Sequence, residues 1–90
     1  MEKRLDELVI GESGVIKSVT GEGKIRRRLF DMGVTPNAEV FLRKKAPLGD
    51  PIEVTLRGYE LTLRKSEAQN VIVILNESNE NKVEGKEENK

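Results

Sequence analysis

The segment from residue 52 to residue 64 has the pattern that most constrains the fold of this chain. Two short runs alternate apolar and polar side chains, and the dipeptide Arg57-Gly58 separates them. A two-residue connection between alternating runs predicts an antiparallel hairpin whose apolar residues share one face. The predicted cross-strand pairs are Ile52 with Leu63, Val54 with Leu61 and Leu56 with Tyr59. A shift by one residue would bury the polar set instead, so the pattern specifies the register.

Three further strands are predicted from short apolar runs bounded by turn-forming residues, at residues 15–19, 39–45 and 71–75. In the first run, Val15 and Val19 are expected to share one face. The second run has apolar residues in succession around Phe41, which indicates partial cover on both faces. The last run is uniformly apolar, which favours a central position in the sheet.

One segment, at about residues 24–32, has a helical period. Ile25, Leu29 and Met32 are spaced at i, i+4 and i+7, as in a helix with one buried stripe. Gly33 follows at the position where helices commonly end in a left-handed residue. The sequence therefore predicts one short helix that packs against the sheet.

Turns and shorter helical pieces complete the expected elements. Residues 35–38 read Thr-Pro-Asn-Ala, which is typical of a type II turn and requires a positive φ at Asn37. One helical turn is expected at residues 5–8, with Leu5 and Leu8 against the core. Another is expected at residues 66–69, with Ser66 as the candidate cap.

Charged residues are spread unevenly along the 90-residue chain. Residues 1–75 carry 13 basic and 11 acidic side chains, whereas residues 76–90 carry three Lys, five Glu and one apolar residue, Val83. The second segment cannot offset its chain entropy by burial, so we expect a disordered acidic tail after one small domain over residues 1–75. The overall net charge of zero argues against a dedicated nucleic-acid or membrane-surface binder.

The predicted elements together indicate a mainly β fold. About five short strands and one short helix fit within the first domain, and no strand–helix–strand alternation is present. The simplest arrangement is a highly curved antiparallel sheet, partly closed into a small SH3-like barrel. No apolar run approaches the roughly 18 residues that span a bilayer, and no signal-peptide pattern is present. We therefore expect a soluble, cytoplasmic protein.

The side chains available exclude several kinds of chemistry. The chain has no His and no Cys, so it has no imidazole base, no thiolate nucleophile and no ordinary nitrogen–sulfur metal site. We expect no catalytic, cofactor-binding or metal-binding residues, and no enzyme activity. Residues 11–18 approach the phosphate-binding G-x-x-x-x-G-K-[ST] pattern, but Ile16 replaces the second Gly and no helix is predicted to follow. A turn into a strand is the favoured interpretation.

Basic clusters leave three interpretations open. Arg26, Arg27 and Arg28 are consecutive, but neighbouring helical residues point about 100° apart, so they spread around the helix. Lys24 and Arg28 share a face. The basic residues can be a solvated surface, a docking surface for an acidic protein, or a nucleic-acid contact. The chain has one Tyr and no Trp, so stacking platforms for single strands are nearly absent.

Three ordered stretches resemble the ferrous iron transport protein A (FeoA) family: RRRLFDMGVTP at residues 26–36, KAPLGDPI at residues 45–52 and RGYELTLR at residues 57–64. The resemblance covers roughly residues 5–75. Asn37 stands where the family pattern has Gly, and the acidic tail is not part of the pattern. The resemblance implies an SH3-like barrel in the cytoplasm that acts with the membrane GTPase-permease FeoB in ferrous iron uptake. It also implies the fold of the carboxy-terminal domain of metal-dependent repressors, although this chain has no room for their helix-turn-helix module.

The resemblance and the residues together favour an adaptor that docks on FeoB and modulates its activity, without a cofactor of its own. The expected docking residues are Lys24, Arg27 and Arg28 on the helix, and Leu48 and Asp50 in the loop over residues 46–51. Three alternatives stay open: a nucleic-acid-binding or repressor-like module, an arginine supplied to the partner's GTPase reaction, and Leu48 as a plug over one barrel end. Arg57 and Arg64 are expected to hold loop carboxylates such as Asp50.

Overall fold

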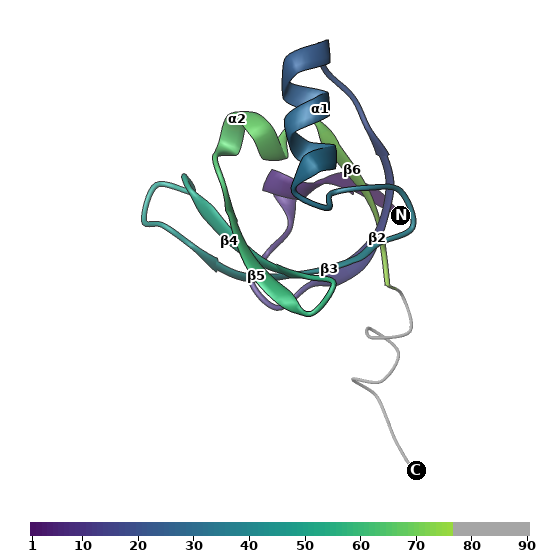
Figure 1. Ribbon diagram of the computed structural model, residues 1–90. Coiled ribbons are helices and arrows are strands. Elements are labelled where there is room, and N and C mark those ends of the chain that lie inside the picture. The colour runs from purple at the N-terminus through teal and green to yellow at the C-terminus, as the bar shows by residue number, and fades with distance from the viewer. Residues whose placement is uncertain (77–90) are drawn as a thin grey trace.

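Six antiparallel strands form one strongly curved sheet in the computed structural model, which describes residues 1–76. The strand order is β1-β6-β2-β3-β4-β5. The elements along the chain are β1 (Glu2–Arg4), the 3-10 turn η1 (Leu5–Glu7), β2 (Ser13–Val19), α1 (Gly23–Asp31), β3 (Glu39–Lys45), β4 (Ile52–Leu56), β5 (Tyr59–Leu63), α2 (Lys65–Ala68) and β6 (Val71–Leu75). Figure 1 shows both helices at the same open end of the curved sheet. Except for Asn76, the tail predicted over residues 76–90 lies outside the described residues.

The β4–β5 hairpin has the predicted register at every position. Ile52 pairs with Leu63, Val54 with Leu61, and Leu56 with Tyr59. The two connecting residues both have positive φ, 51° at Arg57 and 87° at Gly58, as tight hairpin turns require. All residues of the apolar set are buried or half-buried except Tyr59 at the hairpin end.

A β-bulge changes which residues of β2 face the core. The pairing of β2 with β6 shifts between Ile16 and Ser18. As a result Ile16 and Val19 are buried, whereas Val15 is only half-buried. The expectation that Val15 and Val19 share one buried face is therefore wrong, because the extra residue of a bulge reverses the alternation.

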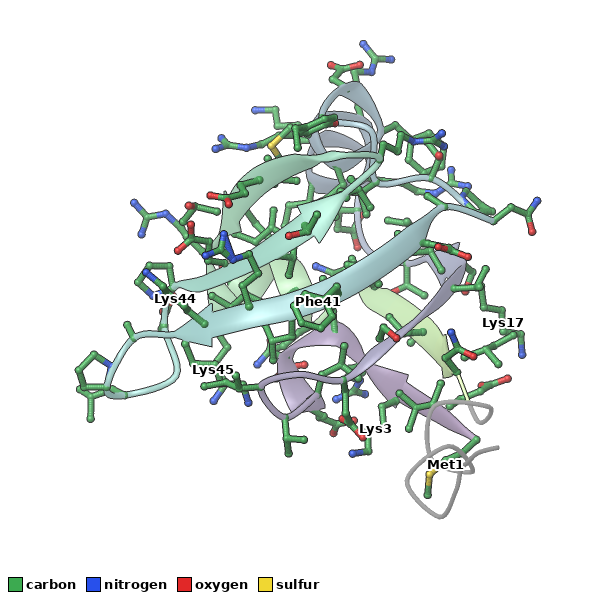
Figure 2. All side chains as sticks on the ribbon, turned by 90° about the horizontal axis from the view of Figure 1, so that it is seen from below. Met1, Lys3, Lys17, Phe41, Lys44 and Lys45 are labelled. Atoms are coloured by element: carbon green, nitrogen blue, oxygen red, sulfur yellow. The ribbon has the colours of Figure 1, made fainter. Side chains whose placement is uncertain are left out.

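The outer face of β3 is less covered than its apolar run predicts. Val40 and Leu42 are buried, but Phe41 points outward and remains 42% exposed. Figure 2 shows Phe41 near the middle of β3 on this outer face, with Lys44 and Lys45 further along the strand. Only the inner face of β3 belongs to the core.

Helix α1 buries the predicted stripe. Leu29 is fully buried, and Ile25 and Met32 are half-buried against the core. Gly33 ends the helix with φ of 95°, and a Cβ at this position would lie 2.4 Å from the Tyr59 hydroxyl. Only glycine suits this junction, which the hairpin end approaches closely.

The turns also follow the prediction. Asn37 has φ of 77°, as a type II turn requires. The turn at η1 buries Leu5 and Leu8 completely. Residues 11–18 form a turn and the beginning of β2, which confirms the interpretation made from the sequence.

Two local features differ from the expectation. Strand β1 was not predicted, because its residues are polar and its place in the sheet comes from backbone pairing with β6. The capping residue of α2 is Arg64, whereas Ser66 lies inside the helix. Strand β6 lies between β1 and β2, which confirms its central position. Within residues 1–76, no helix has the length and apolar character needed to cross a membrane.

Candidate functional site

A cleft of about 370 Å³ lies between α1, α2 and the loop that connects β3 to β4; we call it the helix–loop cleft. Its lining residues come from α1, from the loop, from β5 and from the beginning of α2: Arg28, Asp50, Pro51, Thr62, Arg64 and Glu67. Two of the predicted docking residues, Arg28 and Asp50, therefore meet here although they are far apart in the sequence.

Glu67 is the buried centre of the cleft wall. Its exposed fraction is 8%, and it is the one buried charged residue in the described part of the chain. One carboxylate oxygen accepts a hydrogen bond from the Arg64 backbone N–H at 2.9 Å. The other lies 3.0 Å from Nε of Arg28. A carboxylate is costly to bury unless it is paired, so these two contacts join the beginning of α2 to α1.

Sequence reasoning missed Glu67. Its only local signal is its position three residues after the cap of α2, where a Glu often accepts from the backbone N–H of the capping residue. With Arg at the cap in place of Ser or Thr, the signal is incomplete.

Asp50 anchors the β3–β4 loop to α2. Its carboxylate accepts a hydrogen bond from the Lys65 backbone N–H at 2.9 Å. The expectation that Arg57 holds this carboxylate is wrong, since Nε of Arg57 donates to the Gly33 carbonyl at 3.2 Å and a terminal nitrogen donates to Thr35. Arg57 instead ties the hairpin to the end of α1.

Arg64 lines the cleft without an ion-pair partner within residues 1–76. The expectation that it holds Asp50 is therefore wrong as well. Its neighbour Lys65 is exposed, and Lys24 lies one helical turn before Arg28 on α1. The lining itself carries two basic and two acidic side chains, so its formal charge is zero, and the two lysines lie near it in the chain.

Leu48 does not plug the barrel. Its exposed fraction is 91%. The loop closes on itself through backbone hydrogen bonds from Gly49 to Ala46 and from Ala46 to Pro51, and Figure 1 shows it projecting beside the hairpin. The plug interpretation is wrong, and an apolar side chain stands in solvent at the loop tip.

The three consecutive arginines of α1 diverge as predicted. Arg26 donates from Nε to the Val19 carbonyl at 3.1 Å and lies 5.0 Å from the ring centre of Phe30. Arg27 lines a separate pocket on α1, together with Arg26 and Phe30. Of these three, only Arg28 enters the helix–loop cleft.

The outer sheet face, formed by the outward residues of β1, β2, β3 and β6, has a different character. Phe41 and Ile74 are each 42% exposed, and Figure 2 shows Lys3, Lys17 and Lys44 on different sides of Phe41. Two of the cations here are paired with carboxylates: Lys3 with the half-buried Glu12 at 3.3 Å and Lys17 with the exposed Glu2 at 2.6 Å. Lys44 has no ion-pair partner within residues 1–76.

At the edge of this face, Arg43 forms an ion pair with Glu60. The hydrogen bond and the charge of Arg43 lower the pKa of Glu60, and Glu60 in turn raises the pKa of Arg43. Glu60 is exposed and Arg43 is half-buried, so the pair lies at the surface. Among residues 1–76, no three side chains of the metal-ligating types lie together.

The sequence matches the FeoA domain family over residues 3–75. It is 36% identical over 76 residues to the Fe(2+) transport protein A/Fe(2+) transporter FeoB fusion protein of Porphyromonas gingivalis. That match covers 84% of this chain and 9% of the fusion protein, so the chain spans a small part of that relative's length.

Solved structures share the fold. A FeoA-like protein from Clostridium acetobutylicum is 40% identical, with a TM-score of 0.77, over 82% of this chain and 86% of that one. The FeoA of Stenotrophomonas maltophilia, described as a prokaryotic SH3 domain protein and solved with zinc, is 32% identical, with a TM-score of 0.66, over 87% and 92%. The predicted SH3-like fold is confirmed. A manganese-dependent transcriptional repressor, 14% identical with a TM-score of 0.77, shares the fold alone.

Proposed function

Because this chain belongs to the FeoA family, we propose that it is an accessory protein of ferrous iron uptake that docks on the FeoB GTPase-permease and modulates its activity. The observation that carries the proposal is the fusion protein, in which a FeoA-like region and FeoB occupy one chain. A fusion holds its two parts at high effective concentration, which is useful when they act on each other. The protein would work on the cytoplasmic side of the membrane.

The predicted docking residues fit this proposal as one surface. Arg28 and Asp50 line the helix–loop cleft, Lys24 lies one helical turn from Arg28, and Leu48 stands exposed on the loop that Asp50 anchors. Arg27 lies further around α1 and would extend the surface only if the partner wraps the helix. A cleft lined by two arginines, beside the exposed apolar side chain of Leu48, favours a protein partner.

A pull-down against the full transporter, with and without guanine nucleotide, tests the proposal. The wild-type protein should retain the transporter, and Leu48→Glu should weaken retention several-fold because a charge replaces the apolar contact. Since Leu48 is exposed, the melting temperature of the Leu48→Glu variant should stay within about a degree of that of the wild-type protein.

Ile10→Glu is the matched control. Ile10 is also an exposed aliphatic residue, on another loop, so this variant should retain the transporter like wild type. Absence of the transporter from the wild-type pull-down in both nucleotide states would end the proposal. Equal weakening by both variants would remove Leu48 from the docking surface.

The alternatives receive no specific support from the geometry. A nucleic-acid-binding or repressor-like role rests on the shared fold alone. Of the three arginines that could be supplied to a GTPase site, Arg26 is held at the Val19 carbonyl. Arg27 and the terminal nitrogens of Arg28 are accessible, but no observation favours catalysis over docking for either of them. Docking remains the function that the surface favours.

A further inference from the structure

We propose that the helix–loop cleft binds an acidic peptide segment, whose carboxylates contact Arg64 and Arg28. The inference deepens the proposed function, on which it rests for the identity of the partner protein. The ligand chemistry follows from the cleft itself and can be tested without that partner.

The first argument is the buried carboxylate behind the cleft. Glu67 is nearly inaccessible, and both of its oxygens have partners within the chain. Its negative charge is therefore already compensated and presents little repulsion to an incoming anion. The contact with Nε fixes the direction of the Arg28 side chain and leaves its terminal nitrogens as donors. A guanidinium held in this way loses less conformational entropy when it binds a second carboxylate.

The second argument is the unpaired guanidinium of Arg64. Outside the cleft, Arg43 forms an ion pair with Glu60. Arg64, inside the cleft, has no carboxylate partner within the described residues. Lys65 follows Arg64 in the chain, and Lys24 lies one helical turn before Arg28 on α1. The second acidic residue of the lining, Asp50, accepts a hydrogen bond from the Lys65 backbone N–H. Clusters of arginine are the usual means of recognising acidic motifs.

The third argument is the size and border of the cleft. A volume of about 370 Å³ accommodates a few side chains. Thr62 supplies a hydroxyl at one wall, Pro51 an apolar surface at another, and Leu48 stands on the adjoining loop. The fitting ligand is therefore a short segment with adjacent carboxylates followed by an apolar residue.

The experiment uses the full chain and a capped synthetic peptide that repeats two adjacent glutamates followed by one leucine. In the control peptide, every glutamate is replaced by glutamine. In a two-dimensional NMR titration, the glutamate peptide should shift the Lys65 amide and the Nε–H signals of Arg28 and Arg64. Arg64→Gln should weaken binding about tenfold, the loss expected for one charge-assisted contact. Arg43→Gln removes the same charge outside the cleft and should change the affinity less than twofold.

Three results would overturn the inference: equal shifts with the glutamine peptide, shifts confined to the outer sheet face, or equal weakening by the two variants. Failure here is separable from failure of the proposed function. A transporter that binds wild type and Arg64→Gln equally would leave docking in place and remove the cleft from it. A chain that binds the acidic peptide but never the transporter would leave the cleft in place and remove FeoB as its partner.

Discussion

The helix–loop cleft and the outer sheet face are built from the same residue types, but they use them differently. On the sheet face, Lys3 pairs with the half-buried Glu12 and Lys17 with the exposed Glu2. In the cleft, the carboxylate of Glu67 is buried behind the arginine that it holds, and Arg64 has no partner among the described residues. Two lysines of the sheet face are therefore neutralised within the chain, while the cleft keeps one arginine without a carboxylate partner among residues 1–76.

This difference shows why a charge count is a poor guide to binding. Exposed ion pairs contribute little to stability, because water screens both groups and the side chains lose freedom. A buried carboxylate with two partners costs more to remove, and it holds its arginine in one direction. Two surfaces with similar composition can therefore differ in whether their cations remain available to a ligand.

The largest difference in stability between the two surfaces is expected at Glu67. Glu67→Ala removes the acceptor for the Arg64 backbone N–H and the partner of Arg28, so we expect a loss of about 2 kcal/mol in the free energy of unfolding. Glu2→Ala, on the sheet face, should cost less than about 1 kcal/mol. Urea denaturation of both variants provides the measurement.

Glu67→Gln serves as the intermediate variant, because its amide oxygen can still accept from the Arg64 N–H. We expect it to recover part of the loss. Equal costs for Glu67→Ala and Glu2→Ala would mean that the buried carboxylate of the cleft contributes no more to stability than an exposed one on the sheet face.

A smaller effect is expected at the loop. Asp50→Ala removes the acceptor for the Lys65 N–H and should cost about 1 kcal/mol. Asp50→Asn keeps that acceptor and should cost less. Hydrogen exchange at the Lys65 amide reports the loss directly: exchange should accelerate in Asp50→Ala and change little in Asp50→Asn. Unchanged exchange in both variants would mean that the Asp50 carboxylate does not hold the loop to α2 through the Lys65 N–H.

The smallest effect on stability is expected from the Arg43–Glu60 ion pair at the edge of the sheet face. Arg43 holds the pKa of Glu60 below its ordinary value of 4.5. A lowered carboxyl pKa stabilises the fold at pH values above the ordinary pKa, and this contribution disappears as the pH falls through the lowered pKa. Arg43→Gln should return the pKa of Glu60 toward 4.5, as a carbon-detected NMR titration of its carboxyl group can measure. An unchanged pKa would indicate that the ion pair is absent in solution.

The sequence contains enough local information to predict most of the fold. Alternation over residues 52–64 specifies the hairpin and its register, and the spacing of Ile25, Leu29 and Met32 specifies the buried side of α1. Asn37 was predictable because few residues tolerate a positive φ. In these cases the signal lies within a few consecutive residues.

The remaining features depend on contacts between distant segments. Strand β1 forms because the backbone of β6 lies beside it, and the bulge in β2 follows from the curvature of the whole sheet. Arg28 and Asp50 were predicted singly, but their meeting in one cleft depends on α2, whose Glu67 resembles every other surface glutamate in the sequence. Burial of a charged residue is decided by the packing of elements, which no local pattern contains.

The position of β6 has a consequence for how the protein is made. Strands β1 and β2 both pair with residues 71–75, so neither has its complete set of partners until nearly the whole domain has been synthesised. The β4–β5 hairpin, by contrast, can pair as soon as its own residues leave the ribosome. Long-range pairing slows folding, and a chain that stops before Val71 would expose the edges of both amino-terminal strands to other chains. The sheet is therefore completed only by the last strand, β6, which lies between β1 and β2.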